Sequence, residues 1–94
     1  MKLDHVAIIV DNIEESIEWY SQNFNARVNY VDETWASIRI GDLNVSFVLK
    51  DMHPAHIAFD LTGTPCNALK KHRDGSNYEY LEDPSGNVIE KIWW

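Results

Sequence analysis

Two histidines and one glutamate are the side chains whose types and positions suggest chemistry. His5 stands in residues 4–8 and His56 in residues 55–59, and each histidine is followed by an apolar run that favours a strand. Glu90 lies in the last run of this kind. Two imidazoles and one carboxylate can hold a divalent ion with coordination positions left open, which suits Fe, and related sites take Mn, Zn or Ni. The sequence therefore predicts a metal site of His5, His56 and Glu90.

The two histidine segments begin two similar units, and such internal repeats bear directly on the fold. In the first unit, residues 3–10 predict a buried strand with His5 on the same face as Ala7. Asn12 and Glu15 are typical of a helix start, and an apolar stripe continues to about residues 23–25. Three further strands are predicted, over residues 26–31, 34–40 and 43–49. The first unit is thus β-α-β-β-β.

The second unit is expected to be a shorter version of the first. Residues 55–61 predict its first strand, and Pro65 after Thr64 favours a helix over residues 66–72. Strands over 77–82 and 87–93 flank a turn at 83–86, where Pro and Gly favour a hairpin. Glu90 follows His56 by 34 residues, whereas Ser46 follows His5 by 41. We therefore expect the second unit to lack or shrink one strand.

Composition excludes several classes of partner. The 94 residues suffice for one domain, and the 45% hydrophobic content suffices for a core. A net charge of −7 without a basic stripe argues against nucleic acid and anionic membranes. No apolar run reaches about 18 residues, and the start of the chain has no signal-peptide pattern. Cys66 is a single cysteine, so we expect a cytoplasmic protein without an intrachain disulfide.

Four segments together carry a family resemblance: residues 3–10, 13–20, 56–59 and 83–90. They are similar to the strands, helix and closing hairpin of the vicinal oxygen chelate superfamily, the group of glyoxalases, bleomycin-resistance proteins and extradiol dioxygenases. The resemblance implies an α+β fold in one domain, residues 1–94. Two βαβββ modules, about 1–50 and 55–94 with the second shortened, would form a curved mixed sheet around a cavity. The resemblance also implies a homodimer.

The resemblance places metal ligands on the first and last strands of each module. Carried over, these positions are His5, Ser46, His56 and Glu90. Ser46 is a poor ligand, so the sequence departs from the four-ligand glyoxalase pattern and is closer to the three-ligand pattern of extradiol dioxygenases and fosfomycin-modifying enzymes. Glu90 is then both a metal ligand and the candidate catalytic carboxylate.

Ser46, Arg39, Tyr78 and Tyr80 are candidate substrate-binding residues. Arg39 could hold an anionic substrate, but a surface arginine is the simpler interpretation. The two tyrosines share a strand face and either line a pocket or pack at a sheet edge. His53 and His72 stand in loop-like contexts, where we expect solvated side chains.

Two functions remain in competition. The metal triad favours an enzyme of lyase, isomerase or dioxygenase type that acts on a small oxygen-rich metabolite through one divalent ion. The alternative is a metal-free small-molecule binding or drug-sequestering protein of the bleomycin-resistance type. A module whose site is only a relic is a third interpretation, suggested by Ser46 and the short second unit.

Overall fold

The computed structural model describes residues 1–68 and 70–94. The chain forms two compact units. The N-terminal unit is His5–Ala55, and the C-terminal unit combines Met1–Asp4 with His56–Trp94. Within the described residues, no helix is long and apolar enough to cross a membrane. The chain is a mixed α+β protein, as the sequence predicted.

The N-terminal unit has the predicted order of one strand, one helix and three strands. Its elements are β1 (Lys2–Val10), α1 (Ile13–Phe24), β2 (Arg27–Val31), β3 (Trp35–Ile40) and β4 (Leu43–Leu49). The strand order is β2-β3-β4-β1. β1 runs parallel to β4, whereas β3 pairs antiparallel with both β2 and β4. The crossover through α1 is what allows β1 to join the sheet in parallel.

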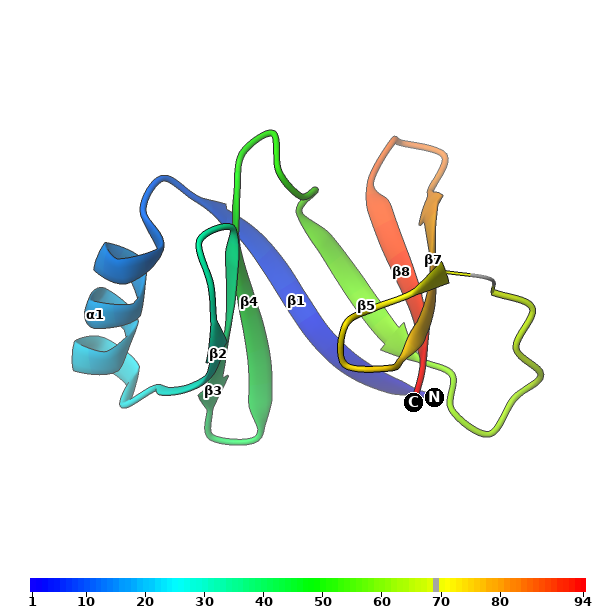
Figure 1. Cartoon of the computed structure of the whole chain (residues 1–94), viewed down its shortest axis with the longest axis horizontal. Helices are drawn as coiled ribbons and strands as arrows, with labels where there is room; N and C mark the ends of the chain where they lie inside the picture. Colours follow the sequence, from blue (N-terminus) through cyan, green and yellow to red (C-terminus); the bar gives the residue numbers. More distant parts are fainter. Residues whose placement is uncertain (69) are drawn as a thin grey trace. The chain divides into compact units, whose positions relative to one another are not determined.

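α1 begins and ends as its sequence predicts. The Oδ1 atom of Asn12 accepts a hydrogen bond of 2.9 Å from the backbone N–H of Glu15, and this contact caps the first turn. The helix ends at Asn25, whose φ of 54° is left-handed. α1 lies beside β3 and β4, and Ile13 joins a buried cluster with Ile38 and Phe47 (Figure 1). This cluster is the apolar core of the N-terminal unit.

The C-terminal unit contains β5 (His56–Asp60), β6 (Lys70–Lys71), β7 (Asn77–Glu82) and β8 (Val88–Trp93). Their order is β5-β8-β7-β6, with β5 parallel to β8 and the other pairs antiparallel. The predicted turn between β7 and β8 is confirmed. Asp83 closes it by accepting hydrogen bonds from Asn87 and Ser85, and the bonds from Asn87 are the main reason that the pKa of Asp83 is lowered.

The helix predicted over residues 66–72 is wrong. Residues 64–68 are not helical, residue 69 lies outside the described residues, and Lys70–Lys71 form β6 instead. The expected shrinkage of one strand is confirmed, since β6 has only two residues. The described part of this unit contains no helix. A hairpin thus stands where the repeat predicted a helix.

The last two residues tie the C-terminus to its unit. Trp93 is buried, and its indole Nε1 donates to the hydroxyl of Thr64 over 3.2 Å. Trp94 is 60% exposed, yet its indole Nε1 donates to Asp4 Oδ1 over 2.8 Å. Residues from both ends of the chain are therefore joined within the C-terminal unit.

Candidate functional site

Glu90 is the centre of the candidate site in the C-terminal unit. Its residue is only 1% exposed, which is unusual for a glutamate. In the sheet, Glu90 is paired with Ala58 of β5 on one side and Tyr80 of β7 on the other. Side chains of directly paired residues project from the same face of a sheet. The small Ala58 leaves room beside the carboxylate, and Tyr80 borders it.

His56 shares this face and approaches the carboxylate. Its Nε2 atom lies 3.3 Å from Oε1 of Glu90, and its side chain is 5% exposed. The imidazole also meets the ring of Tyr80 edge to face, with 5.2 Å between centroids. The structure thus places the two sequence-predicted ligands of this unit, His56 and Glu90, in direct contact. A buried imidazole and a buried carboxylate side by side form a donor set that suits a divalent ion.

His72 is the site residue that sequence reasoning missed. We expected a solvated loop histidine, but its Nε2 atom lies 2.6 Å from Oε2 of Glu90. Its ring stacks on Tyr78, with 3.6 Å between centroids and 7° between planes. The sequence does contain a signal for this position, the turn-forming pair Asp74-Gly75. Read as the turn of a β-hairpin, it would have placed His72 beside β7.

Tyr78 and Tyr80 complete an aromatic border around Glu90. Their rings meet edge to face, with 5.4 Å between centroids. Burial is the main reason that the pKa of Tyr80 is raised far above its ordinary value, and the charge of Glu90 and then Tyr78 contribute further. The phenol of Tyr80 therefore stays protonated and keeps its O–H available as a hydrogen-bond donor. The two predicted tyrosines do share a face, and they share it with Glu90.

The candidates of the N-terminal unit occupy different surroundings. Ser46 is buried and is paired with Ala7 and Ser37. Arg39 donates to the carbonyl oxygen of Gly41 over 3.0 Å and to Oδ1 of Asn44 over 3.3 Å. These contacts support the turn between β3 and β4, which favours the simpler interpretation of Arg39 as a structural surface residue.

His5 is partly buried and is the first residue of the N-terminal unit. Ile8 and Val10 of the same strand pack with the cluster under α1. Strand alternation therefore puts His5, together with Ala7, on the face of β1 away from the helix. Its neighbour in sequence, Asp4, accepts the hydrogen bond from Trp94.

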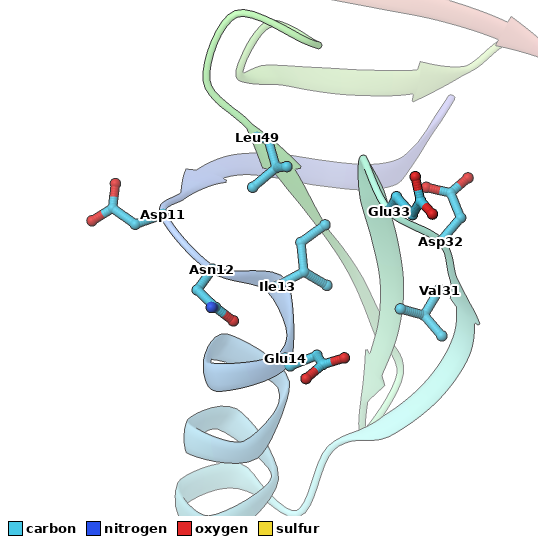
Figure 2. Close-up of a pocket in the computed structure, with 8 residues that line it drawn as sticks. All are labelled: Asp11, Asn12, Ile13, Glu14, Val31, Asp32, Glu33 and Leu49. Atoms are coloured by element: carbon cyan, nitrogen blue, oxygen red, sulfur yellow. The ribbon is translucent and has the colours of Figure 1, made fainter.

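A separate acidic hollow of about 450 Å³ lies in the N-terminal unit. Figure 2 shows Ile13 and Leu49 between Asp11 on one side and Asp32 and Glu33 on the other. None of the predicted site residues lines it. These carboxylates belong to the start of α1 and to the loop after β2.

Asp32 in this hollow is a structural carboxylate. Burial would raise its pKa, but hydrogen bonds from the hydroxyl of Tyr30, from both backbone and side chain of Thr34, and from the backbone of Trp35 outweigh that effect. The net result lowers the pKa of Asp32 to about 2. Asp32 therefore remains charged over most of the pH range and holds the connection between β2 and β3.

Comparison with known proteins gives a consistent family. The family model described as the Glyoxalase/Bleomycin resistance protein/Dioxygenase superfamily matches residues 2–90. No match was found among curated proteins.

Several solved structures share the fold at low sequence identity. Methylmalonyl-CoA epimerase from Mycobacterium tuberculosis is 15% identical with a TM-score of 0.73, and the match covers 97% of this chain and 86% of the epimerase. The 2,3-dioxygenase LapB from Pseudomonas sp. KL28 is 16% identical with a TM-score of 0.73, over 99% of this chain and 42% of LapB. The fosfomycin resistance protein FosX from Listeria monocytogenes, in complex with Mn(II) and sulfate, is 17% identical with a TM-score of 0.50, over 96% and 87%.

Proposed function

The chain belongs to the Glyoxalase/Bleomycin resistance protein/Dioxygenase superfamily, and on that premise we propose that it is a divalent-metal-dependent enzyme. The proposed reaction is of lyase, isomerase or dioxygenase type on a small oxygen-rich metabolite. The observation that carries the proposal is the buried carboxylate of Glu90 in contact with the buried imidazole of His56. A buried charge needs hydrogen bonds, an ion partner or a metal to offset its lost hydration.

His5, His56 and Glu90 are the proposed metal ligands, because the family resemblance implies these positions and two imidazoles with one carboxylate are a donor set for a divalent ion. FosX shows that a member with a similar fold binds Mn(II). The proposed ion is Fe, Mn, Zn or Ni.

Each residue of the site has a proposed task. A bound ion would supply Lewis acidity toward substrate oxygens. Tyr80 would donate a hydrogen bond to the substrate, since its phenol stays protonated, and Tyr78 would line the same face. Glu90 is assigned the catalytic role because its carboxylate is buried among the histidine and tyrosine rings of the site. Ser46 is proposed as a further substrate contact, whereas the hydrogen bonds of Arg39 to Gly41 and Asn44 favour a structural role for that residue.

The decisive experiment is elemental analysis of untagged protein beside three histidine variants. The proposal expects near-stoichiometric Fe, Mn, Zn or Ni in the parent, and loss of the metal in His5→Ala and in His56→Ala. His53→Ala is the matched control, because His53 contacts Thr34 in the N-terminal unit and is not a proposed ligand. This control should keep its metal.

Two outcomes would contradict the proposal in different ways. Full metal content in His5→Ala would remove His5 from the ligand set. A parent that contains no metal, and takes up none when these ions are added, would favour the metal-free binding function instead. Ligand screening by thermal shift would then be the next step.

We also propose that the protein forms a homodimer. β2 is an edge strand of its unit, it is exposed along its whole length, and it carries Val28 and Val31. An exposed apolar edge strand invites pairing with another chain. Light scattering at micromolar concentration should give the dimer mass. A monomer mass in the parent would contradict the proposal.

A further inference from the structure

The shortened second unit brings an additional histidine to Glu90. The hairpin β6–β7 turns through residues 72–75, where the N–H of His72 donates to the carbonyl of Ser76 over 2.9 Å and the N–H of Gly75 donates to the carbonyl of His72 over 3.0 Å. Asp74 accepts from both the N–H and the hydroxyl of Ser76. Gly75 has a φ of +92°, which favours glycine. The backbone of His72 is therefore fixed on both sides.

The side chain of His72 is equally well held. Its ring lies flat on Tyr78, and its Nε2 atom reaches Oε2 of Glu90 at 2.6 Å. Since an ionised carboxylate only accepts, the tautomer of His72 that donates to Glu90 is the one with its hydrogen on Nε2. Short hydrogen bonds to a charged group are about twice as strong as neutral ones. The side chain of His72 is 30% exposed, whereas that of Glu90 is 1% exposed, so His72 stands between the carboxylate and solvent.

The two oxygens of Glu90 have different neighbours. Oε1 lies beside His56 at 3.3 Å, and Oε2 lies beside His72 at 2.6 Å. The two histidines thus contact different oxygens of Glu90. A hydrogen bond at Oε2 prevents the carboxylate from rotating away and leaves the Oε1 side toward His56.

We propose that His72 is a positioning residue, which fixes the carboxylate of Glu90 for its role in the metal site. This inference rests on the proposed function, because Glu90 is a ligand only in that proposal. Hydrogen-bond partners behind a metal ligand typically contribute roughly 10- to 100-fold to metal affinity. The hydrogen bond carries this effect, and the ring stacking on Tyr78 only orients the donor.

Three substitutions of His72 separate hydrogen bonding from stacking. His72→Gln keeps an N–H donor, His72→Phe keeps a flat ring without a donor, and His72→Ala keeps neither. Circular dichroism establishes that each variant is folded. The dissociation constant and stoichiometry for Zn²⁺ or Mn²⁺ are then measured by competition with a chelator at one pH. His53→Ala is the control.

We expect His72→Ala and His72→Phe to weaken metal binding by roughly 10- to 100-fold while one ion per chain still binds at saturation. His72→Gln should recover most of the lost affinity. An unchanged dissociation constant in His72→Ala, or full affinity in His72→Phe, overturns the inference and leaves the proposed function standing. Loss of stoichiometry in His72→Ala would make His72 a ligand, which also overturns it.

A second readout needs no metal. In the metal-free protein, ¹⁵N spectra of the imidazoles should show a hydrogen on Nε2 of His72, and Glu90→Gln should shift this signal because a neutral amide is the weaker acceptor. If the parent binds no metal, the proposed function fails, and this spectrum alone decides whether His72 holds Glu90. A His72 signal that does not respond to Glu90→Gln overturns the inference.

Discussion

Removal of the Glu90 carboxylate should cost far more stability than removal of an exposed carboxylate on the same sheet. In the metal-free protein, Glu90 lies 2.6 Å from Nε2 of His72 and 3.3 Å from Nε2 of His56, with almost no exposure to solvent. Glu90→Ala removes the acceptor of a buried polar contact and leaves a cavity. Each polar partner left unsatisfied costs about 1 to 3 kcal/mol, and the cavity adds to this, so we expect a total of about 3 to 5 kcal/mol. That is a large part of the roughly 5 to 15 kcal/mol by which a domain is stable.

Glu90→Gln provides the internal comparison. Glutamine has nearly the same shape, and its amide can direct its oxygen toward the N–H of His72 and its NH₂ toward His56. Because both polar contacts can be replaced, we expect the free energy of unfolding to change by only about 1 kcal/mol. The same variant should not bind the metal, since it lacks the charge. Glu90→Gln would therefore lose metal binding while it keeps nearly the stability of the parent protein.

Urea denaturation with a chelator present measures these differences, and a thermal scan gives an independent check. For a chain of this length, each kcal/mol corresponds to about 4 to 8 °C, so Glu90→Ala should lower the Tm by about 12 °C or more. Glu79→Ala on β7 is the matched control, because Glu79 is exposed, and it should change stability by less than about 0.5 kcal/mol. An Ala variant within 1 kcal/mol of the parent, or a Gln variant as unstable as the Ala variant, would refute the reasoning.

Three further predictions concern the N-terminal unit. The pKa of Asp32 is about 2 in the folded protein, below its ordinary value of 3.8. Its contribution to the free energy of unfolding is therefore complete above about pH 4 and is lost as the pH falls toward 2. Asp32→Asn should cost about 1 to 2 kcal/mol at pH 7, allowing for its partial exposure, and the difference from the parent should narrow below pH 4 in urea titrations. Asn12→Ala removes the cap of α1 and should cost about 1 kcal/mol by urea denaturation, whereas Asn12→Ser should restore most of it. Phe47→Ala empties a fully buried position and should cost about 3 to 5 kcal/mol, and a thermal shift of a few degrees or less would contradict this.

Local signals were sufficient for the N-terminal unit. Asn12 before a helical apolar stripe specified where α1 begins, and the alternation in β1 specified which face carries His5. The same kind of signal failed in the C-terminal unit. Thr64-Pro65 resembles a helix start, but the following residues offer no apolar stripe, and an isolated helix of two turns is marginal in water. Without a buried face, the start signal alone does not produce a helix.

The candidate site was predictable in part for the same reason. His56, Glu90 and the two tyrosines lie on strands whose phase could be read from the sequence. His72 could not be placed, because its position depends on the pairing of β6 with β7, which follows from a turn and not from periodicity. Arg39 was assigned two interpretations, and only its hydrogen bonds to Gly41 and Asn44 favour one of them.

The difference between the two units bears on where chemistry can be located. The buried cluster of Phe47, Ile38 and Ile13 under α1 lies wholly in the N-terminal unit. In the C-terminal unit, Glu90 and Ile92 are both among the largest fully buried side chains. An ionisable residue therefore occupies a buried position where an apolar residue is usual. Such a charge lowers stability unless hydrogen bonds or an ion compensate for it. The β6–β7 hairpin supplies that compensation through the contact of His72 with Glu90. Among the described residues, a hairpin in place of the predicted helix is therefore consistent with a unit that carries a functional site, because stability and function compete for the same buried positions.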